Sequence, residues 1–362
     1  MGRWARPTLN VATIDDVARL AGVSPATVSR VVNIEKNVRE ATRQRVCEAV
    51  RELNYVPNLA ARSLASAGQV RLGVVYNNPS EAYLSALLIG AMEESAARGV
   101  MLLMVRCEPG DDASESATIA RLRDGAVNGV LLPAQHDETS RIFNMRKALN
   151  IPTVAVGAGA SEAEVSCVHV DDRAAAFEMT AHLLDLGHRR IGFIKGHPDR
   201  PASRARTAGF EAALATVPGV VATTAQGFFT FESGLAAAEQ LLSDDDRPTA
   251  IFASNDAMAA AVISVAQRQG LVVPRDLTVV GFDDTQIAVT QWPPLTTVRQ
   301  PVAAMAAAAI ELLLDEIRAG RDGALTAPVD QVLPHVLIQR SSCAPPRAEA
   351  RPRPRVLIAQ SR

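Results

Sequence analysis

Seven short and almost continuously apolar runs recur along the chain from residue 70 onward, and segments of helical composition separate most of them. Strands that are buried on both faces show this pattern, because helices cover both sides of a parallel sheet. The pattern therefore predicts doubly wound parallel α/β structure. One sheet rarely extends over so long a segment, so we expect two sheets with a cleft between them. The runs are residues 70–76, 100–105, 128–134, 152–158, 189–196, 249–254 and 277–284.

The size and composition of the chain fit a globular protein with more than one domain. It has 362 residues, of which 48% are hydrophobic, and no apolar run approaches the ~20 residues of a membrane span. The first residues, MGRWARPTLNVATIDD, lack the apolar region of a secretory signal. We therefore expect a cytoplasmic protein that does not enter a membrane.

The four cysteines lie far apart, at positions 47, 107, 167 and 343. This spacing indicates reduced thiols and not a zinc site or a disulfide framework. The histidines also lack metal-ligand spacing, and we interpret them as structural or surface groups: His136, His169, His182, His188, His197 and His335. The sequence thus predicts no metal and no cofactor.

The charge is distributed unevenly along the chain. Residues 1–66 carry ten basic and six acidic side chains, whereas the remainder carries 27 basic and 33 acidic ones. A basic segment on an acidic body suggests a module that binds a polyanion, although a solvated helix face can have the same charge.

The segment TIDDVARLAGVSPATVSRVVN, residues 13–33, predicts two short helices around a tight turn. Thr13 is a suitable N-cap, and Asp16 completes a capping box. Gly22 ends the first helix, Ser24 caps the second, and Pro25 occupies its first position.

The second of these helices has an inward face of valines and an outward face that suits a DNA groove. The outward stripe consists of Ala26, Ser29, Arg30 and Asn33. Such a helix fits the major groove, with Arg30 able to reach a guanine edge and Ser29 or Thr27 a phosphate. An ordinary solvated helix is the alternative. A third helix is expected at about residues 39–54.

The head, including VREATRQRVCEAVRELNYVPNLAARSLA after the second helix, closely resembles the DNA-binding head of the lactose-repressor (LacI/GalR) family. The resemblance implies that the helix beginning at Ser24 is the recognition helix. It assigns base reading to Pro25, Ala26 and Arg30. It assigns backbone or peripheral contacts to Ser24, Thr27, Ser29, Asn33 and Asn37.

The stretch PNLAARSLAS, residues 57–66, follows the head. Asn58 can cap a short helix there, which is too short to be stable alone in water. By the family resemblance this hinge helix lies in the DNA minor groove, and Leu64 is the apolar wedge that enters a base step. A loose linker, with Leu64 touching the body, is the alternative.

Ligands of open α/β sheets bind beyond the carboxyl ends of the strands. Asn77, Asn255 and Asp283 follow predicted strands directly. No Gly-rich phosphate loop follows any of them, because GAGA at 157–160 lacks both a GxGxxG continuation and a Walker lysine.

The body also resembles the LacI/GalR family, in HLLDLGHRRIGFI, FASNDAMA, VVGFDD and PPLTTVRQP. The resemblance implies two lobes of the periplasmic-binding-protein type. Residues 1–57 would form the head, 58–68 the hinge helix and linker, 69–341 the effector-binding and dimerisation domain, and 342–362 a disordered tail. The implied effector contacts are Tyr83, Arg206, Phe229, Asn255, Asp283 and Gln300.

Other roles remain open for three of these residues. Arg206 could pair with a surface carboxylate, Phe229 could be ordinary core, and Asp283 could be a helix N-cap, with Asp284 the structural neighbour. Gly157 departs from the family, because several sugar-responsive members carry an aspartate there.

The resemblance implies a repressor of carbohydrate-utilisation genes, not an enzyme, in which a small ligand, expected to be a sugar, controls affinity for palindromic double-stranded operator DNA. It also implies a homodimer or higher oligomer. A purine- or nucleoside-responsive regulator is the nearest alternative. A solute-binding receptor would lack the head, and an α/β hydrolase or kinase would need GxSxG or a Walker lysine, neither of which occurs.

Overall fold

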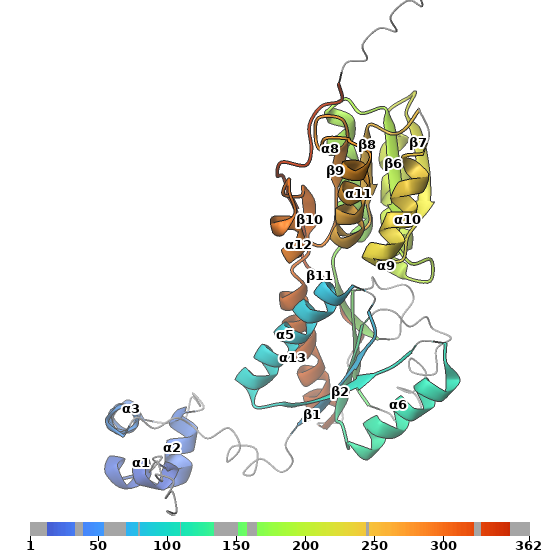
Figure 1. Ribbon diagram of the computed structural model, residues 1–362. Coiled ribbons are helices and arrows are strands. Elements are labelled where there is room, and N and C mark those ends of the chain that lie inside the picture. The colour runs from blue at the N-terminus through green and yellow to red at the C-terminus, as the bar shows by residue number, and fades with distance from the viewer. Residues whose placement is uncertain are drawn as a thin grey trace, which may run out of the picture. The chain divides into compact units, whose positions relative to one another are not determined.

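The computed structural model describes residues 13–32, 39–53, 70–78, 80–108, 110–133, 151–157, 165–243, 246–321 and 327–347. The chain divides into two compact units, a head of residues 1–70 and a body of residues 71–362 (Figure 1). The hinge segment, with Asn58 and Leu64, lies outside the described residues, as do Asn33 and Asn37.

The head contains helices α1 (Ile14–Ala21), α2 (Pro25–Val32) and α3 (Glu40–Glu52). The capping box of Thr13 and Asp16 is formed, and Gly22 closes α1 in the left-handed conformation with φ 65°. One small core unites the three helices, as the apolar spacing predicts. Its fully buried members are Val17, Ala18, Ala21, Val28, Val31, Val46 and Ala49.

The first lobe of the body has a six-stranded parallel sheet in the order β11-β5-β4-β3-β1-β2. Its strands are β1 (Arg71–Tyr76), β2 (Met101–Arg106), β3 (Gly129–Pro133), β4 (Thr153–Val156), β5 (Ser166–His169) and β11 (Asp330–Val332). Its helices are α5 (Glu81–Arg98), α6 (Asp112–Asp124) and α13 (Val302–Arg321).

These helices cover opposite faces of the first sheet (Figure 1). Gly129 faces Leu313 of α13, whereas Gly73, on the other face by the strand register, faces Leu122 of α6. Helix α5 packs closely on α13 at Gly90, where a Cβ would lie 2.4 Å from the carbonyl oxygen of Ala303.

The second lobe has a four-stranded parallel sheet in the order β7-β6-β8-β9. Its strands are β6 (Arg190–Lys195), β7 (Val221–Gln226), β8 (Ala250–Ala253) and β9 (Thr278–Val280). Its helices are α8 (Asp172–Asp185), α9 (Pro201–Leu214), α10 (Phe231–Leu241), α11 (Asp256–Arg268) and α12 (Gln286–Thr290).

A small antiparallel pair, β10 (Thr297–Arg299) with β12 (Val336–Ile338), completes the body. The chain passes between the lobes after β5, after β10 and after β11 (Figure 1). The predicted helix-turn-helix head and two parallel α/β lobes are thereby confirmed. None of the described helices is long and apolar enough to span a bilayer.

The first residues of the segment that the sequence predicts to be a disordered tail are ordered. Residues 342–347 pack on the second lobe, where the Ser342 hydroxyl is buried and donates to the Val279 carbonyl oxygen at 2.6 Å. Arg347 pairs with Asp276 at 2.8 Å. The boundary at residue 342 is therefore wrong, because proline-rich sequence here lies in an extended segment that the lobe stabilises. Residues 348–362 lie outside the described residues.

Candidate effector pocket and DNA-binding helix

Helix α2 presents the residues expected to read DNA. Pro25, Ala26 and Arg30 are exposed on it. The Ser24 hydroxyl accepts from the Thr27 backbone N–H at 3.2 Å and lies 2.9 Å from the Thr27 hydroxyl, so the two residues together cap the helix. Ser29 belongs to α2, but its side chain is not described.

A cavity of about 60 Å³ lies between the two lobes of the body. An adjoining cavity of about 410 Å³ shares Ser80, Phe229 and Asp283 with it. Five of the six predicted effector residues line the smaller cavity, and Asn255 lines the adjoining one. The smaller cavity is lined by Asn78, Ser80, Tyr83, Val156, Gly157, Arg200, Ala202, Arg206, Phe229, Asp283 and Gln300.

Arg206 is held by buried groups and not by a surface carboxylate. Its Nε donates to Asp172 Oδ1 at 2.7 Å, and one terminal nitrogen lies 3.6 Å from Asp283 Oδ1. The guanidinium carbon also lies 3.6 Å from the centre of the Phe282 ring. Stacking and a charge-assisted hydrogen bond together fix the orientation of Arg206.

The turn after β9 places its two aspartates in different surroundings. Asp283 and Asp284 both have positive φ, 107° and 55°, a strained conformation that clusters at functional sites. Asp284 forms ion pairs with Arg299 and Arg340, each at 2.6 Å. Asp283 lines the cavity and accepts from Gln300 Nε2 at 2.6 Å. The N-cap of α12 is Thr285 and not Asp283.

Burial dominates the ionisation of the pocket carboxylates. It raises the pKa of Asp283 to about 6, although Arg206 and Gln300 act in the opposite direction. Burial also raises the pKa of Asp172 against the effect of Arg206. The pKa of the Tyr83 phenol is raised as well, by burial and by the nearby Asp172 and Asp283 carboxylates. The pocket is therefore a site of low dielectric, where charges interact strongly.

Phe229 is positioned by its backbone and by a glycine. It has φ 66°, and its carbonyl oxygen accepts from Asn255 Nδ2 at 2.9 Å. Its ring lies on Gly196, where a Cβ would come within 2.0 Å of the ring. Phe229 is 7% exposed and lines both cavities, so it combines core packing with a surface that faces the cavities.

Asn255 has a mainly structural position. Its Oδ1 accepts from the Met258 backbone N–H at 3.0 Å, which caps α11, while its Nδ2 holds the Phe229 carbonyl. It is 1% exposed. Its amide thus positions Phe229 and leaves little capacity for a direct ligand contact.

Tyr83 occupies the space next to Gly157. A Cβ on Gly157 would lie 2.7 Å from the Tyr83 hydroxyl, and Gly157 has φ 88°. The tyrosine hydroxyl therefore lies where a side chain at position 157 would begin, which is the position at which an aspartate was expected by resemblance to several sugar-responsive family members.

Sequence reasoning missed several residues of the cavity. Asn78 lines it, whereas the predicted strand-end residue Asn77 donates to Glu108 Oε2 at 2.6 Å. Asp172 was missed because the short strand before it was not recognised. Arg200 was missed because nothing in the sequence marks it. Its Nε is buried without a hydrogen-bond partner in the described residues, and burial lowers its pKa to about 10.

Two family models match the chain. Residues 13–58 match "Bacterial regulatory proteins, lacI family", and residues 180–343 match "Periplasmic binding protein-like domain". The HTH-type transcriptional repressor PurR of Photobacterium profundum is 33% identical over 310 residues, which cover 85% of this chain and 92% of the relative.

Solved structures show the same organisation. A complex of the transcriptional regulator CelR with cellobiose has a TM-score of 0.69 and 32% identity, covering 91% of this chain and 99% of the other. A lac repressor dimer bound to operator and the anti-inducer ONPF has a TM-score of 0.66 and 27% identity, with 92% and 100% covered. These relatives are DNA-binding transcriptional regulators and not enzymes, and the chain belongs to the LacI family of bacterial transcriptional repressors.

Proposed function

We propose that the effector of this repressor is a carbohydrate that binds in the cavity between the lobes. The observation that carries the proposal is the placement of the Phe229 ring beside Asp283 and Arg206 around one cavity. An aromatic face suits the apolar C–H side of a sugar ring, while a carboxylate and a guanidinium suit its hydroxyls. The cellobiose complex of CelR supports the proposal by similarity.

Arg200 favours a second class of effector. Its guanidinium lines the same cavity and has a buried Nε with no hydrogen-bond partner among the described residues. A ligand with a carbonyl or anionic oxygen would satisfy this donor. Together with the flat Phe229 ring, this supports a purine or nucleoside as the alternative effector.

Calorimetric titration of the full chain with a panel of mono- and disaccharides, and separately with purine bases and nucleosides, distinguishes the two. We expect a sugar to bind and to change operator protection in footprinting by several-fold. In Asp283→Asn, sugar binding should weaken at least tenfold, while operator binding without ligand stays unchanged. If only purine bases or nucleosides bind, the effector is a purine or nucleoside and not a sugar. If no ligand shifts DNA affinity, the switch itself is wrong.

A homodimer on a palindromic operator is the proposed assembly. Helix α5 and strand β2 carry large exposed apolar side chains, at exposures of 53% for Ile89, 59% for Met92 and 45% for Met101. Leu87, on the same helix, is buried inside the lobe and cannot serve a partner. Sedimentation should find a dimer that Met92→Glu weakens, whereas Glu93→Gln, the neighbouring change, should leave it intact.

DNA recognition by α2 is part of the same proposal. Arg30 and Ala26 lie on its exposed face, as base-reading side chains must. A function at operator DNA also implies a protein of the bacterial cytoplasm. Whether the effector releases or recruits the operator follows from the footprinting experiment above.

A further inference from the structure

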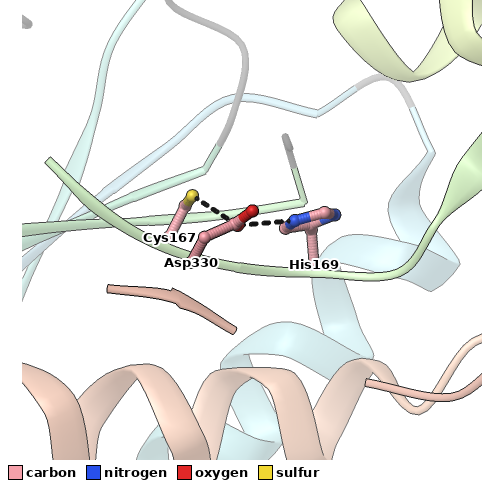
Figure 2. A group of neighbouring side chains, drawn as sticks. All are labelled: Cys167, His169 and Asp330. Atoms are coloured by element: carbon pink, nitrogen blue, oxygen red, sulfur yellow. Dashed lines mark hydrogen bonds and ion pairs between the residues drawn. The ribbon is translucent and has the colours of Figure 1, made fainter. Parts of the chain in front are cut away.

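Three side chains with metal-binding atoms meet at the edge of the first sheet, outside the effector pocket (Figure 2). Cys167 and His169 are two residues apart on β5, so they point to the same face. Strand β11 pairs in parallel with β5, and Asp330 lies opposite Cys167. The sulfur, a ring nitrogen and a carboxylate oxygen all lie within 4.8 Å of one another.

The cluster lies on the face of the sheet that α13 does not cover. Ser166, which points to the other face of β5, hydrogen bonds to Glu316 of α13. Cys167 and His169 are buried, whereas the Asp330 side chain is 48% exposed. Solvent can therefore reach the cluster from the side of Asp330.

The hydrogen bonds orient the histidine toward the other two groups. His169 Nδ1 lies 2.8 Å from the Val170 carbonyl oxygen. A carbonyl can only accept, so Nδ1 carries a proton and Nε2 faces the cluster. Metal-binding histidines are oriented in this way by a backbone carbonyl. Asp330 Oδ1 lies 2.8 Å from Nε2 and 3.2 Å from Cys167 Sγ.

We propose that Cys167, His169 and Asp330 bind a divalent transition-metal ion, with zinc as the best match and water at a fourth position. One sulfur, one nitrogen and one oxygen donor suit a tetrahedral zinc site with an open coordination position. A thiolate and an imidazole disfavour calcium and magnesium, which take oxygen ligands.

The fit requires only a small movement. Zinc–ligand bonds of about 2.0–2.3 Å at tetrahedral angles separate neighbouring ligand atoms by roughly 3.3–3.7 Å. The two shorter separations here are 2.8 and 3.2 Å, and both involve Asp330 Oδ1. Because Asp330 is half exposed, its side chain can withdraw by about half an ångström.

Metal binding has to displace a proton from Cys167. Burial and the Asp330 carboxylate raise the pKa of this thiol to about 12, so the free site holds S–H and not thiolate. On binding, the S–H bond breaks and a sulfur–metal bond forms. The proton in the hydrogen bond between His169 Nε2 and Asp330 Oδ1 must also leave so that both atoms can bind the metal, and both protons pass to solvent. The bound cation then offsets the negative charge that makes a free thiolate unfavourable next to Asp330.

The site joins two of the segments that connect the lobes. His169 ends β5 immediately before the first crossing into α8, and Asp330 lies in β11 immediately before the third crossing into β12. A metal ion would link these two strands by three bonds. We therefore expect it to stabilise the edge of the first sheet against thermal unfolding.

The test is a cobalt titration of the reduced, metal-stripped full-length chain. We expect one Co²⁺ per chain with sulfur-to-cobalt charge-transfer absorption, which Zn²⁺ then abolishes. Cys167→Ser should lose this absorption. Asp330→Asn, at the protein surface, should keep the fold and weaken cobalt binding at least tenfold. Cys107→Ser, a buried cysteine of the same lobe outside the cluster, should leave the absorption unchanged.

Three results would overturn the proposal: no charge-transfer absorption in the unmodified chain, absorption that persists in Cys167→Ser, or equal cobalt affinity in Asp330→Asn. Thermal unfolding gives a second readout. Zinc should raise the melting temperature of the unmodified chain and of Cys107→Ser, and raise that of Asp330→Asn by less. If Cys167→Ser fails to fold, Asp330→Asn decides the question.

Discussion

At the scale of single residues, Gly196 determines where the Phe229 ring lies. A Cβ at Gly196 would come within 2.0 Å of that ring, so Gly196→Ala must displace it. We expect effector affinity to fall at least tenfold, because the aromatic surface of the cavity moves, while ligand-free operator affinity is kept. Gly320→Ala is the matched control, since nothing lies within 4 Å of its Cβ position. Equal effector affinity in both variants would show that the Phe229 ring does not contact the effector. Calorimetric titration measures the effector affinity of both variants.

Asp283 should make effector affinity depend on pH. Its pKa in the folded chain is about 6, against an ordinary value of 3.8, because it is buried. If the Asp283 carboxylate accepts ligand hydroxyls, as we propose, affinity should reach its full value well above pH 6, be about half of it near pH 6, and fall by up to tenfold per pH unit below. In Asp283→Asn this dependence should disappear from titrations at pH 5 to 7.

The raised pKa also affects stability, with the opposite sign. Between the ordinary value and about 6, the folded chain binds a proton at Asp283 that the unfolded chain does not. The free energy of unfolding therefore decreases as pH rises through this window. Asp256, with a pKa of about 7, and Asp172 contribute in the same direction. The free energy of unfolding is measured from pH 4 to 7 in the unmodified chain and in Asp283→Asn. If it increased with pH in the unmodified chain relative to Asp283→Asn, the burial argument would be contradicted.

At the scale of elements, Asn255 joins α11 to the loop that carries Phe229. Asn255→Ala removes both its hydrogen bonds from a buried position, and we expect a loss of about 1–3 kcal/mol in the free energy of unfolding. Effector affinity should fall too, because the Phe229 carbonyl loses its donor. Asp111→Ala removes an exposed N-cap of α6 and should cost about 1 kcal/mol with no effect on the effector. Urea unfolding and calorimetry on both variants separate the two roles.

The elements that the sequence predicted are those with a clear periodicity. Each of the seven apolar runs overlaps a strand, and most of these strands are apolar because both of their faces are covered. Strand β2 is the exception: it lies at a sheet edge and is largely exposed or half-buried, and it was found because most of its exposed side chains are themselves apolar. Strand β7, VATTAQ, was missed because it lies at a sheet edge and is mostly exposed. Strand β5, SCVH, was missed because it is short and half polar, although fully buried. Strand β11 is wholly exposed, and its pairing partner is distant in sequence.

The candidate site was predictable to the extent that family motifs carry it. Asp283, Arg206 and Gln300 were found through such motifs and line one cavity. Arg200 and Asp172 were not found, since their importance depends on burial and on partners that only the fold brings close. The same holds for Cys167 and Asp330, which are far apart in sequence and adjacent across two strands.

At the scale of the whole molecule, the binding of the effector and the binding of the operator share a single coupling free energy. If the effector weakens operator binding by a given factor, the operator-bound protein must bind the effector more weakly by the same factor. Labelled-operator anisotropy with and without effector gives the first factor, and calorimetry of the effector with and without operator gives the second. For a tenfold effect each corresponds to about 1.4 kcal/mol. In Asp283→Asn the midpoint of the operator response should move to an effector concentration at least tenfold higher than in the unmodified chain. Unequal factors would mean that a further equilibrium, such as a change of oligomeric state, is coupled to binding, because reciprocity holds whichever site the ligand occupies. An unchanged operator response in Asp283→Asn would mean that the ligand acts outside the cavity that Arg206, Phe229 and Asp283 surround.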